Sequence, residues 1–422
     1  MKQASVCSAQ HASHAPFGGL NRSRLLAVVA LGLAFAGPAA AEGSFDSLTA
    51  LANGALTGQN VTRPVPGFEL LVLQHGQPLY HQAFGQWTAG QLANVDSSSK
   101  TMSAALLMSV TETHPATFQL DTKLSSLLPA FDRDDKRDIS VRQAFSHTSG
   151  LSGSDVGSPI LANPNITLQQ AASLIAAQPT IAAAGTAFAY GGLSMQAAGA
   201  AAEVATGQAF VDLFQARIAG PLQLADTRFV LASDSNPRVA GGLASTARDF
   251  GRFMDMLLGQ GVDRATGATV LSAASVNTML TRQTTDQQVI INSPADNSLY
   301  GVGVWLDQLG PAGPTVDALA AGARGFHSWI DAASGLVFVF ATDSTTFQNV
   351  ERLSSMMHVA VLSAVPEPSG ALLGMAGLGL VLGLRRRRLN LRGCAQRPER
   401  NYSSDAKLRR AVSSSGNRRS IT

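Results

Sequence analysis

The sequence has little charge and almost no cysteine. Charged residues make up 14% of the 422 residues, and the two cysteines are Cys7 and Cys394. A framework of disulfides is therefore excluded, and a chain of this length can bury a core without one. Apolar residues make up 45%, which excludes a wholly disordered chain.

Acidic and basic residues are unevenly distributed along the chain. Residues 42–384 contain 16 basic and 26 acidic residues, a net charge of −10, whereas residues 385–422 carry a net charge of +10. The overall charge of +3 therefore hides an acidic body. Nucleic-acid binding requires a basic face, so we expect no nucleic acid among the partners of this body.

The N-terminal segment has the three parts of a secretory signal peptide. Arg22 and Arg24 precede an apolar run at 25–37, and small residues follow at 38–41. This order predicts a signal peptide over residues 1–41 with cleavage after Ala41. A buried helix is the alternative interpretation.

The C-terminal region contains a second apolar run, residues 370–384, preceded by Pro366-Glu367-Pro368 and followed by Arg385–Arg388. Fifteen residues are fewer than the roughly 20 of a usual membrane-spanning helix. Basic flanks stay on the cytoplasmic side, so this order places the body outside. Both cysteines then lie outside the exported body.

Residues 364–388 resemble the PEP-CTERM sorting signal. The resemblance implies export by a Gram-negative bacterium to the periplasm or cell surface. It also implies an exosortase-type sorting machinery as partner, with anchoring in the inner membrane through residues 370–384. The basic stretch 389–422, which we expect to be disordered, departs from such signals because they usually end at the arginine cluster. A plain membrane anchor is the alternative.

Between these ends, strand patterns flank a helical middle. Residues 68–85 predict a hairpin around His75-Gly76. Helical spacing predicts helices at 98–112, capped by Asp96 or Ser97, and at 245–259, capped by Ser245 or Thr246. Further strands are expected at 300–307, 326–331 and 336–342, and a further helix at 346–363. The pattern predicts an α/β (α+β) fold whose single antiparallel sheet joins distant segments, with an all-helical insert at about 115–235.

A Ser-x-x-Lys spacing, Ser97 to Lys100, opens the predicted helix at 98–112. Residues three apart share one helix face, so the hydroxyl and the amine can meet. A desolvated lysine loses pKa and can act as a base toward serine. The alternative is a capping serine beside a lysine that extends to solvent. A second copy, Ser404 to Lys407, lies in the basic tail and is attributed to chance.

Several stretches around this motif resemble the serine β-lactamase-related family, in its class C and carboxylesterase branch. They are residues 139–151, 188–203, 241–261, 300–307 and 334–343. The resemblance implies a β-lactamase/transpeptidase-like fold over residues 42–363. It also implies an acyl-enzyme formed on Ser97 with Lys100 as base.

The family's second motif is Tyr-x-Asn, and Tyr190-Gly191-Gly192 matches it in part. The resemblance implies that Tyr190 shares proton transfer with Lys100. A buried tyrosine without catalytic role is the alternative. Gly192 replaces the asparagine and cannot hydrogen-bond a substrate amide.

The third motif, normally Lys-Thr-Gly or His-x-Gly, has no clean match in residues 320–331. Gly322 falls near the motif's glycine, while Arg324 and His327 are candidates for its missing cation. By resemblance, the oxyanion hole combines the Ser97 N–H with one from Gly322–Gly325. We expect His147 to support a loop.

These features together predict an exported serine hydrolase with an esterase-like range of small acyl substrates. No cofactor and no metal site are expected, because the sequence has no phosphate-binding glycine loop with lysine and no metal-ligand spacing. One alternative is a β-lactamase or D,D-carboxypeptidase. The other is a catalytically inactive, surface-sorted binding protein.

Overall fold

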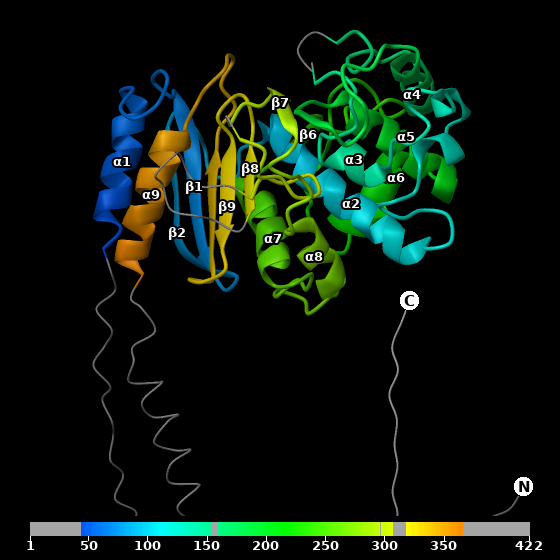
Figure 1. Ribbon diagram of the computed structural model, residues 1–422. Helices are drawn as coiled ribbons and strands as arrows, with labels where there is room; N and C mark the ends of the chain where they lie inside the picture. Colours follow the sequence, from blue (N-terminus) through cyan, green and yellow to red (C-terminus); the bar gives the residue numbers. More distant parts are fainter. Residues whose placement is uncertain (1–43, 154–157, 296, 307–317, 366–422) are drawn as a thin grey trace, which may run out of the picture. The chain divides into compact units, whose positions relative to one another are not determined.

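The predicted hairpin forms the first two strands of the structure. In this computed structural model, which describes residues 44–153, 158–295, 297–306 and 318–365, β1 (Gly67–Gln74) pairs antiparallel with β2 (Gln77–Gly85) (Figure 1). His75 and Gly76 connect them with φ of 48° and 79°. Two left-handed residues in succession suit the twist of paired strands, so the predicted turn is confirmed.

Segments from both ends of the described chain form one five-stranded antiparallel sheet. Its order is β2-β1-β10-β9-β8 (Figure 1). The strands from the C-terminal part are β8 (Ala318–Ala321), β9 (His327–Asp331) and β10 (Leu336–Ala341). The prediction of a sheet built from distant segments is confirmed, and β8 lies at its edge.

Helices cover both faces of this sheet. On one face lie α1 (Asp46–Leu56) and α9 (Glu351–Ala364), and on the other lies α7 (Ala247–Leu258) (Figure 1). Successive β1 side chains therefore enter two different cores, Leu70 with α1 and α9, and Leu71 with α7. As predicted, Thr246 caps α7 by accepting a hydrogen bond from the Asp249 N–H.

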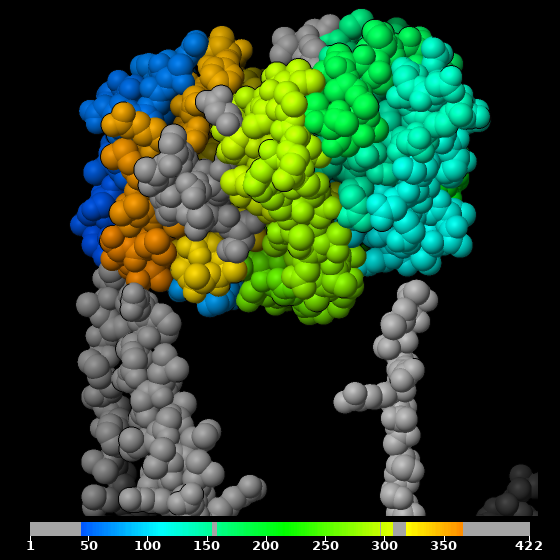
Figure 2. All heavy atoms as spheres, in the orientation of Figure 1, coloured from blue at the N-terminus to red at the C-terminus, as the bar shows by residue number. Residues whose placement is uncertain are grey.

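The middle of the chain forms the helical region, cyan to green in Figure 2, beside the sheet and its blue and orange helices. It is built around α2 (Ser99–Thr113), which is buried on all sides except at its last two residues. The other helices are α3 (Val141–Phe145), α4 (Leu168–Ala176), α5 (Leu193–Thr206), α6 (Phe210–Phe214) and α8 (Ala273–Met279), with a π-helical turn at Gln215–Ala219 and 3₁₀ turns at Asp96–Ser98, Leu124–Ser126 and Pro129–Phe131.

The predicted insert is not purely helical. It contributes β4 (Ala187–Ala189), which pairs in parallel with β7 (Val289–Asn292), and β5 (Arg228–Phe229). A three-stranded sheet in the order β3-β6-β5 joins β5 to β6 (Leu243–Ser245) and β3 (Ala93–Asn94). Such two- and three-residue strands are too short for a period-2 pattern to reveal them.

The strand predicted at 300–307 is wrong. Tyr300 and Trp305 form only an isolated bridge around a turn, and Gly303 has φ of 70°. A Cβ on Gly303 would lie 2.4 Å from the Ala104 Cβ of α2. The turn therefore packs its backbone directly on the central helix, which an extended strand with side chains would not allow.

In the part of the chain that the structure describes, no helix is both long enough and apolar enough to cross a membrane. The predicted signal peptide (1–41), the apolar segment 370–384 and the basic tail (389–422) lie outside the described residues. Their roles remain predictions from the sequence.

Candidate active site

Ser97 lies in a 3₁₀ turn, Asp96–Ser98, that leads into α2. The predicted cap is wrong, because neither Asp96 nor Ser97 caps α2 and its N-terminal residue Ser98 makes no side-chain capping bond. Asp96 adopts φ of 44°, a left-handed conformation that aspartate tolerates better than most residues. This turn places Ser97 at the rim of a pocket, half-buried, rather than inside the helix.

Lys100 lies one turn further on, and its side chain is 1% exposed. Its Nζ donates hydrogen bonds to Ser97 Oγ and to the Ala240 carbonyl oxygen, each at 2.9 Å. The predicted meeting of hydroxyl and amine therefore occurs, although it spans the junction of a 3₁₀ turn and a helix. A buried amine held against a hydroxyl at a pocket wall is suited to move the proton of that hydroxyl.

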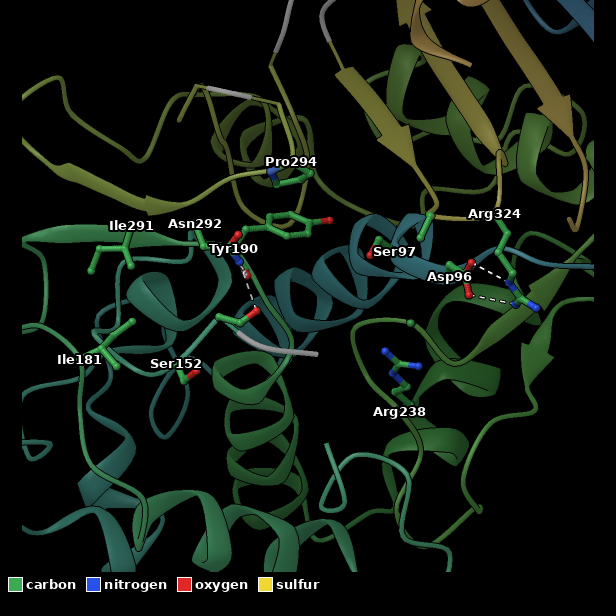
Figure 3. Close-up of a pocket in the computed structure, with 13 residues that line it drawn as sticks. Asp96, Ser97, Ser152, Ile181, Tyr190, Arg238, Ile291, Asn292, Pro294 and Arg324 are labelled. Atoms are coloured by element: carbon green, nitrogen blue, oxygen red, sulfur yellow. Dashed lines mark hydrogen bonds and ion pairs between the residues drawn. The ribbon is translucent and has the colours of Figure 1, made fainter. Parts of the chain in front are cut away.

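Tyr190 follows β4 and lines the same pocket (Figure 3). Lys100 Nζ lies 4.7 Å from the centroid of its ring, and the other side of the cluster is formed by Trp305, stacked at 5.3 Å. In Figure 3 the phenol extends toward Ser97. The structure thus brings the three predicted catalytic residues together in one place.

The position of Tyr190 depends on Asn292, which the sequence interpretation missed. The Tyr190 N–H donates to the Asn292 carbonyl at 2.9 Å, and Asn292 Nδ2 donates to the Tyr190 carbonyl at 2.8 Å. Asn292 also lines the pocket. Its strand-like run, Val289–Asn292, is readable in the sequence, but nothing there links it to a residue 102 positions away.

His147 supports the Tyr190 loop, as expected. It is fully buried in a left-handed conformation, and its ring centroid lies 4.5 Å from that of Tyr190. Its Nδ1 accepts a hydrogen bond from the Gly191 N–H at 3.3 Å. Burial lowers the pKa of His147 well below its usual value, and the charge of Lys100 lowers it further. A neutral imidazole therefore packs beside the tyrosine.

Gly322 lies where β8 meets the serine turn. A Cβ on Gly322 would lie 2.5 Å from the Val95 carbonyl oxygen, so this contact requires glycine. The N–H groups of Gly322 and Gly325 donate to Phe326 and Gly322 carbonyls. Among the predicted range 322–325, the N–H groups left to serve an oxyanion hole are those of Ala323, which lines the pocket, and Arg324.

Arg324 also lines the pocket, but two carboxylates hold its guanidinium. Its Nε and Nη2 donate to the two oxygens of Asp96, both at 2.9 Å, and its Nη1 lies 3.0 Å from Asp343 (Figure 3). The hydrogen bond to Asp96 is the main reason why the pKa of Arg324 is raised. This ion cluster fixes the turn that carries Ser97.

The remaining two predicted residues are not among those that line the pocket. His327 is 4% exposed in β9, and burial lowers its pKa to about 4. Gly192 precedes α5 as its N-cap residue. Their predicted roles in binding therefore find no support in the position of either residue.

The pocket has a volume of about 740 Å³, within the range of small-molecule sites. It is lined by the serine turn, the Tyr190 loop, β7 and the loop after β8, and its residues are Asp96, Ser97, Ser152, Gly153, Ile181, Tyr190, Arg238, Gly241, Ile291, Asn292, Pro294, Ala323 and Arg324 (Figure 3). Within the described ranges, no three His, Cys, Asp or Glu side chains are grouped to hold a metal ion.

Comparisons with known proteins agree with this geometry. A candidate beta-lactamase from Bacteroides dorei DSM 17855 is 27% identical, with a TM-score of 0.64 over 76% of this chain and 98% of that chain. EstCE1, a hydrolase with promiscuous acyltransferase activity, is 19% identical with a TM-score of 0.61 over 75% and 99%. A family VIII carboxylesterase is 18% identical with a TM-score of 0.59 over 74% and 96%.

A search of curated proteins gave no match. The family described as Beta-lactamase matches residues 52–357, which include Ser97, Lys100 and Tyr190. The sheet flanked by helices has the β-lactamase/transpeptidase-like fold of the structural neighbours. The chain belongs to the beta-lactamase family of serine hydrolases.

Proposed function

We propose that the protein is an esterase-like serine hydrolase that acts through an acyl-enzyme on Ser97. The observation that carries this proposal is the 2.9 Å hydrogen bond from Lys100 Nζ to Ser97 Oγ at the wall of the pocket. With Lys100 in its neutral form, the amine accepts the hydroxyl proton as Oγ attacks the ester carbonyl. Backbone N–H groups of Ser97 and Ala323 stabilise the resulting oxyanion.

The second half of the reaction uses the same groups. Tyr190 gives a proton to the departing alcohol oxygen as the ester C–O bond breaks, and regains one through Lys100. Water then attacks the acyl-enzyme, its proton passes to the Lys100–Tyr190 pair, and the acid product leaves with Ser97 restored. The sum is an ester plus water giving an acid plus an alcohol.

An ester substrate is supported by the walls of the pocket. Ile181 and Ile291 line it and are 45% and 48% exposed, so the pocket offers apolar surface to a substrate. Gly192 provides no side-chain amide for a substrate amide. Arg324, the candidate for the cation that would hold a β-lactam carboxylate, already pairs with Asp96 and Asp343.

Turnover of 4-nitrophenyl butyrate and of a chromogenic cephalosporin by the purified protein tests this proposal. We expect ester hydrolysis to exceed β-lactam hydrolysis and to disappear in Ser97→Ala. Ser404→Ala is the matched control, because it removes the serine of the second Ser-x-x-Lys spacing. A fluorophosphonate probe should label the native protein and not Ser97→Ala. Absence of labelling in both would favour an inactive binding protein.

We further propose that the protein is exported and sorted through its C-terminal segment. Support comes from the sequence at residues 1–41 and 364–388. Cell fractionation with mass spectrometry of both termini tests this. Cleavage after Ala41 and near Pro366–Pro368 is expected, and a full-length cytoplasmic protein would contradict it.

A further inference from the structure

Arg238 is a cation in the pocket that the proposed mechanism does not use. It is half-buried and lines the pocket close to Ser97 (Figure 3). Its guanidinium forms no hydrogen bond or ion pair with any residue of described position. The contrast with Arg324 is clear, because Arg324 lines the same pocket with two carboxylates bound to it. Arg238 therefore has donors available for a ligand.

The loop of Arg238 is fixed against the serine turn. Lys100 Nζ donates to the Ala240 carbonyl oxygen, two residues after Arg238. A Cβ on Gly241 would lie 3.4 Å from Arg238 Nε and 3.7 Å from the Asp96 carbonyl carbon. The absence of a side chain at Gly241 thus lets the guanidinium lie close to the turn that carries Ser97. The cation is held near the nucleophile by packing and not by a charged partner.

Arg238 and Tyr190 approach Ser97 from different sides. In Figure 3 the Tyr190 phenol lies above the pocket and the Arg238 guanidinium below it, with Ser97 between their levels. The proposed proton donor, Tyr190, must lie beside the departing alcohol oxygen. The alcohol portion of the ester therefore extends along the Tyr190 side, among Ile181 and Ile291, and the acyl portion extends toward Arg238.

We propose that Arg238 binds a carboxylate on the acyl portion of the substrate, so that the preferred substrates are monoesters of dicarboxylic acids. This inference rests on the proposed function. A guanidinium presents a planar pair of donors that matches the two oxygens of a carboxylate. Hydrolysis then consumes one water and gives a dicarboxylate and an alcohol, with no other reactant. The pocket assigns one end of this substrate to the apolar wall and the other to Arg238.

The test compares two esters with the same leaving group and acyl length, 4-nitrophenyl hydrogen adipate and 4-nitrophenyl hexanoate. The measured quantity is the ratio of kcat/KM for the anionic ester to that for the neutral ester. A hydrogen bond to a charged group contributes about 1.5–3 kcal/mol, so we expect Arg238→Gln to lower this ratio about 10- to 100-fold. The matched control is Arg228→Gln, which removes an exposed arginine of β5 that does not line the pocket. It should leave the ratio unchanged.

The outcomes separate this inference from the proposed function. If Ser97→Ala still hydrolyses both esters, the proposed function fails. If hydrolysis depends on Ser97 but Arg238→Gln leaves the ratio unchanged, the carboxylate site fails and the function stands. An ester with its carboxylate on the leaving group, 4-carboxyphenyl hexanoate, is the third substrate. If Arg238→Gln impairs that substrate instead, the placement of the acyl portion is overturned.

A binding measurement keeps the inference testable without turnover. Calorimetric titration of Ser97→Ala protein with adipate should detect binding that weakens about 10- to 100-fold when Arg238→Gln is added. Equal binding by both proteins would overturn the carboxylate site. Thermal melting of each variant checks that it is folded.

Discussion

Two buried clusters on different parts of the molecule each combine a serine with a proton-accepting side chain. One is Ser97 with Lys100 and Tyr190, at the pocket beside the edge strand β8. The other lies between β9 and α9, where Asp331 Oδ2 is 2.9 Å from Nε2 of His358, and Ser354 precedes His358 by one helical turn. By residue type alone, the second cluster has the better-known catalytic set.

Access and orientation distinguish the two clusters. Ser354 and His358 are each 2% exposed, and the Ser354 hydroxyl oxygen accepts a hydrogen bond from Trp329 Nε1 at 3.1 Å. The Trp329 and His358 rings are packed edge to face. This serine is thus fixed to a tryptophan in a closed core, whereas Ser97 meets its lysine at a pocket wall. The comparison teaches that a serine with a base is structural unless a substrate can reach it.

Lys100→Ala should break the first cluster with the largest effect. Loss of a positioned proton acceptor costs about 10²- to 10⁴-fold in rate, so we expect kcat/KM for 4-nitrophenyl butyrate to fall by about 10³. Lys123→Ala is the control, because that exposed amine bonds only the Asp138 carbonyl oxygen. Retention of a tenth or more of the activity by Lys100→Ala would remove Lys100 from the mechanism.

The region of the second cluster should respond to acid instead of to substrate. His327 lies on the same face of β9 as Trp329, and its pKa of about 4 in the folded protein lies below the usual 6.5. The unfolded chain therefore binds a proton first as the pH falls, so folding stability is complete above about pH 6.5 and declines toward pH 4. The loss amounts to about 3 kcal/mol.

Urea unfolding at pH 7.5 and pH 4.5 measures this effect. His327→Gln should lose that part of the pH dependence, while the part due to buried His147, whose pKa is also lowered, remains. An unchanged pH dependence in His327→Gln would contradict the prediction.

His358→Ala sharpens the comparison in the opposite sense from Lys100→Ala. It leaves Asp331 with an unpaired, mostly buried carboxylate and removes the ring packed on Trp329. We expect a loss of about 2–3 kcal/mol in the free energy of unfolding, measured in urea at pH 7.5. The kcat/KM for the butyrate ester should stay within about twofold, and a large fall would mean that the second cluster serves the reaction.

Arg324→Gln should have the smallest effect of the four. Without the guanidinium, the carboxylates of Asp96 and Asp343 lose their shared partner, and the Ser97 turn is held less firmly. We expect kcat to fall about 10-fold with little change in KM, because geometry at the nucleophile is disturbed and the apolar wall is not. Arg282→Gln, which breaks an exposed ion pair with Asp286, is the control. A specific rise in KM would instead assign Arg324 to substrate binding.

Local patterns predicted much of the fold correctly. The hairpin at His75-Gly76, the helix capped by Thr246 and the strands near 326–331 and 336–342 depend on residues only a few positions apart. The turn at 300–307 failed for the same reason in reverse. Its apolar residues suit a strand, yet contact with Ala104 bends them into a turn.

The sequence by itself determined the spacing that lets Ser97 meet Lys100, because that contact spans three residues. Only the tertiary structure decided that Asn292 holds Tyr190, that Arg324 binds Asp96 across 228 positions, and that Arg238 stays without a charged partner. Contacts within one turn follow from backbone geometry, which each short segment carries with it. Contacts between distant segments depend on how the whole chain packs, and no short segment contains that information.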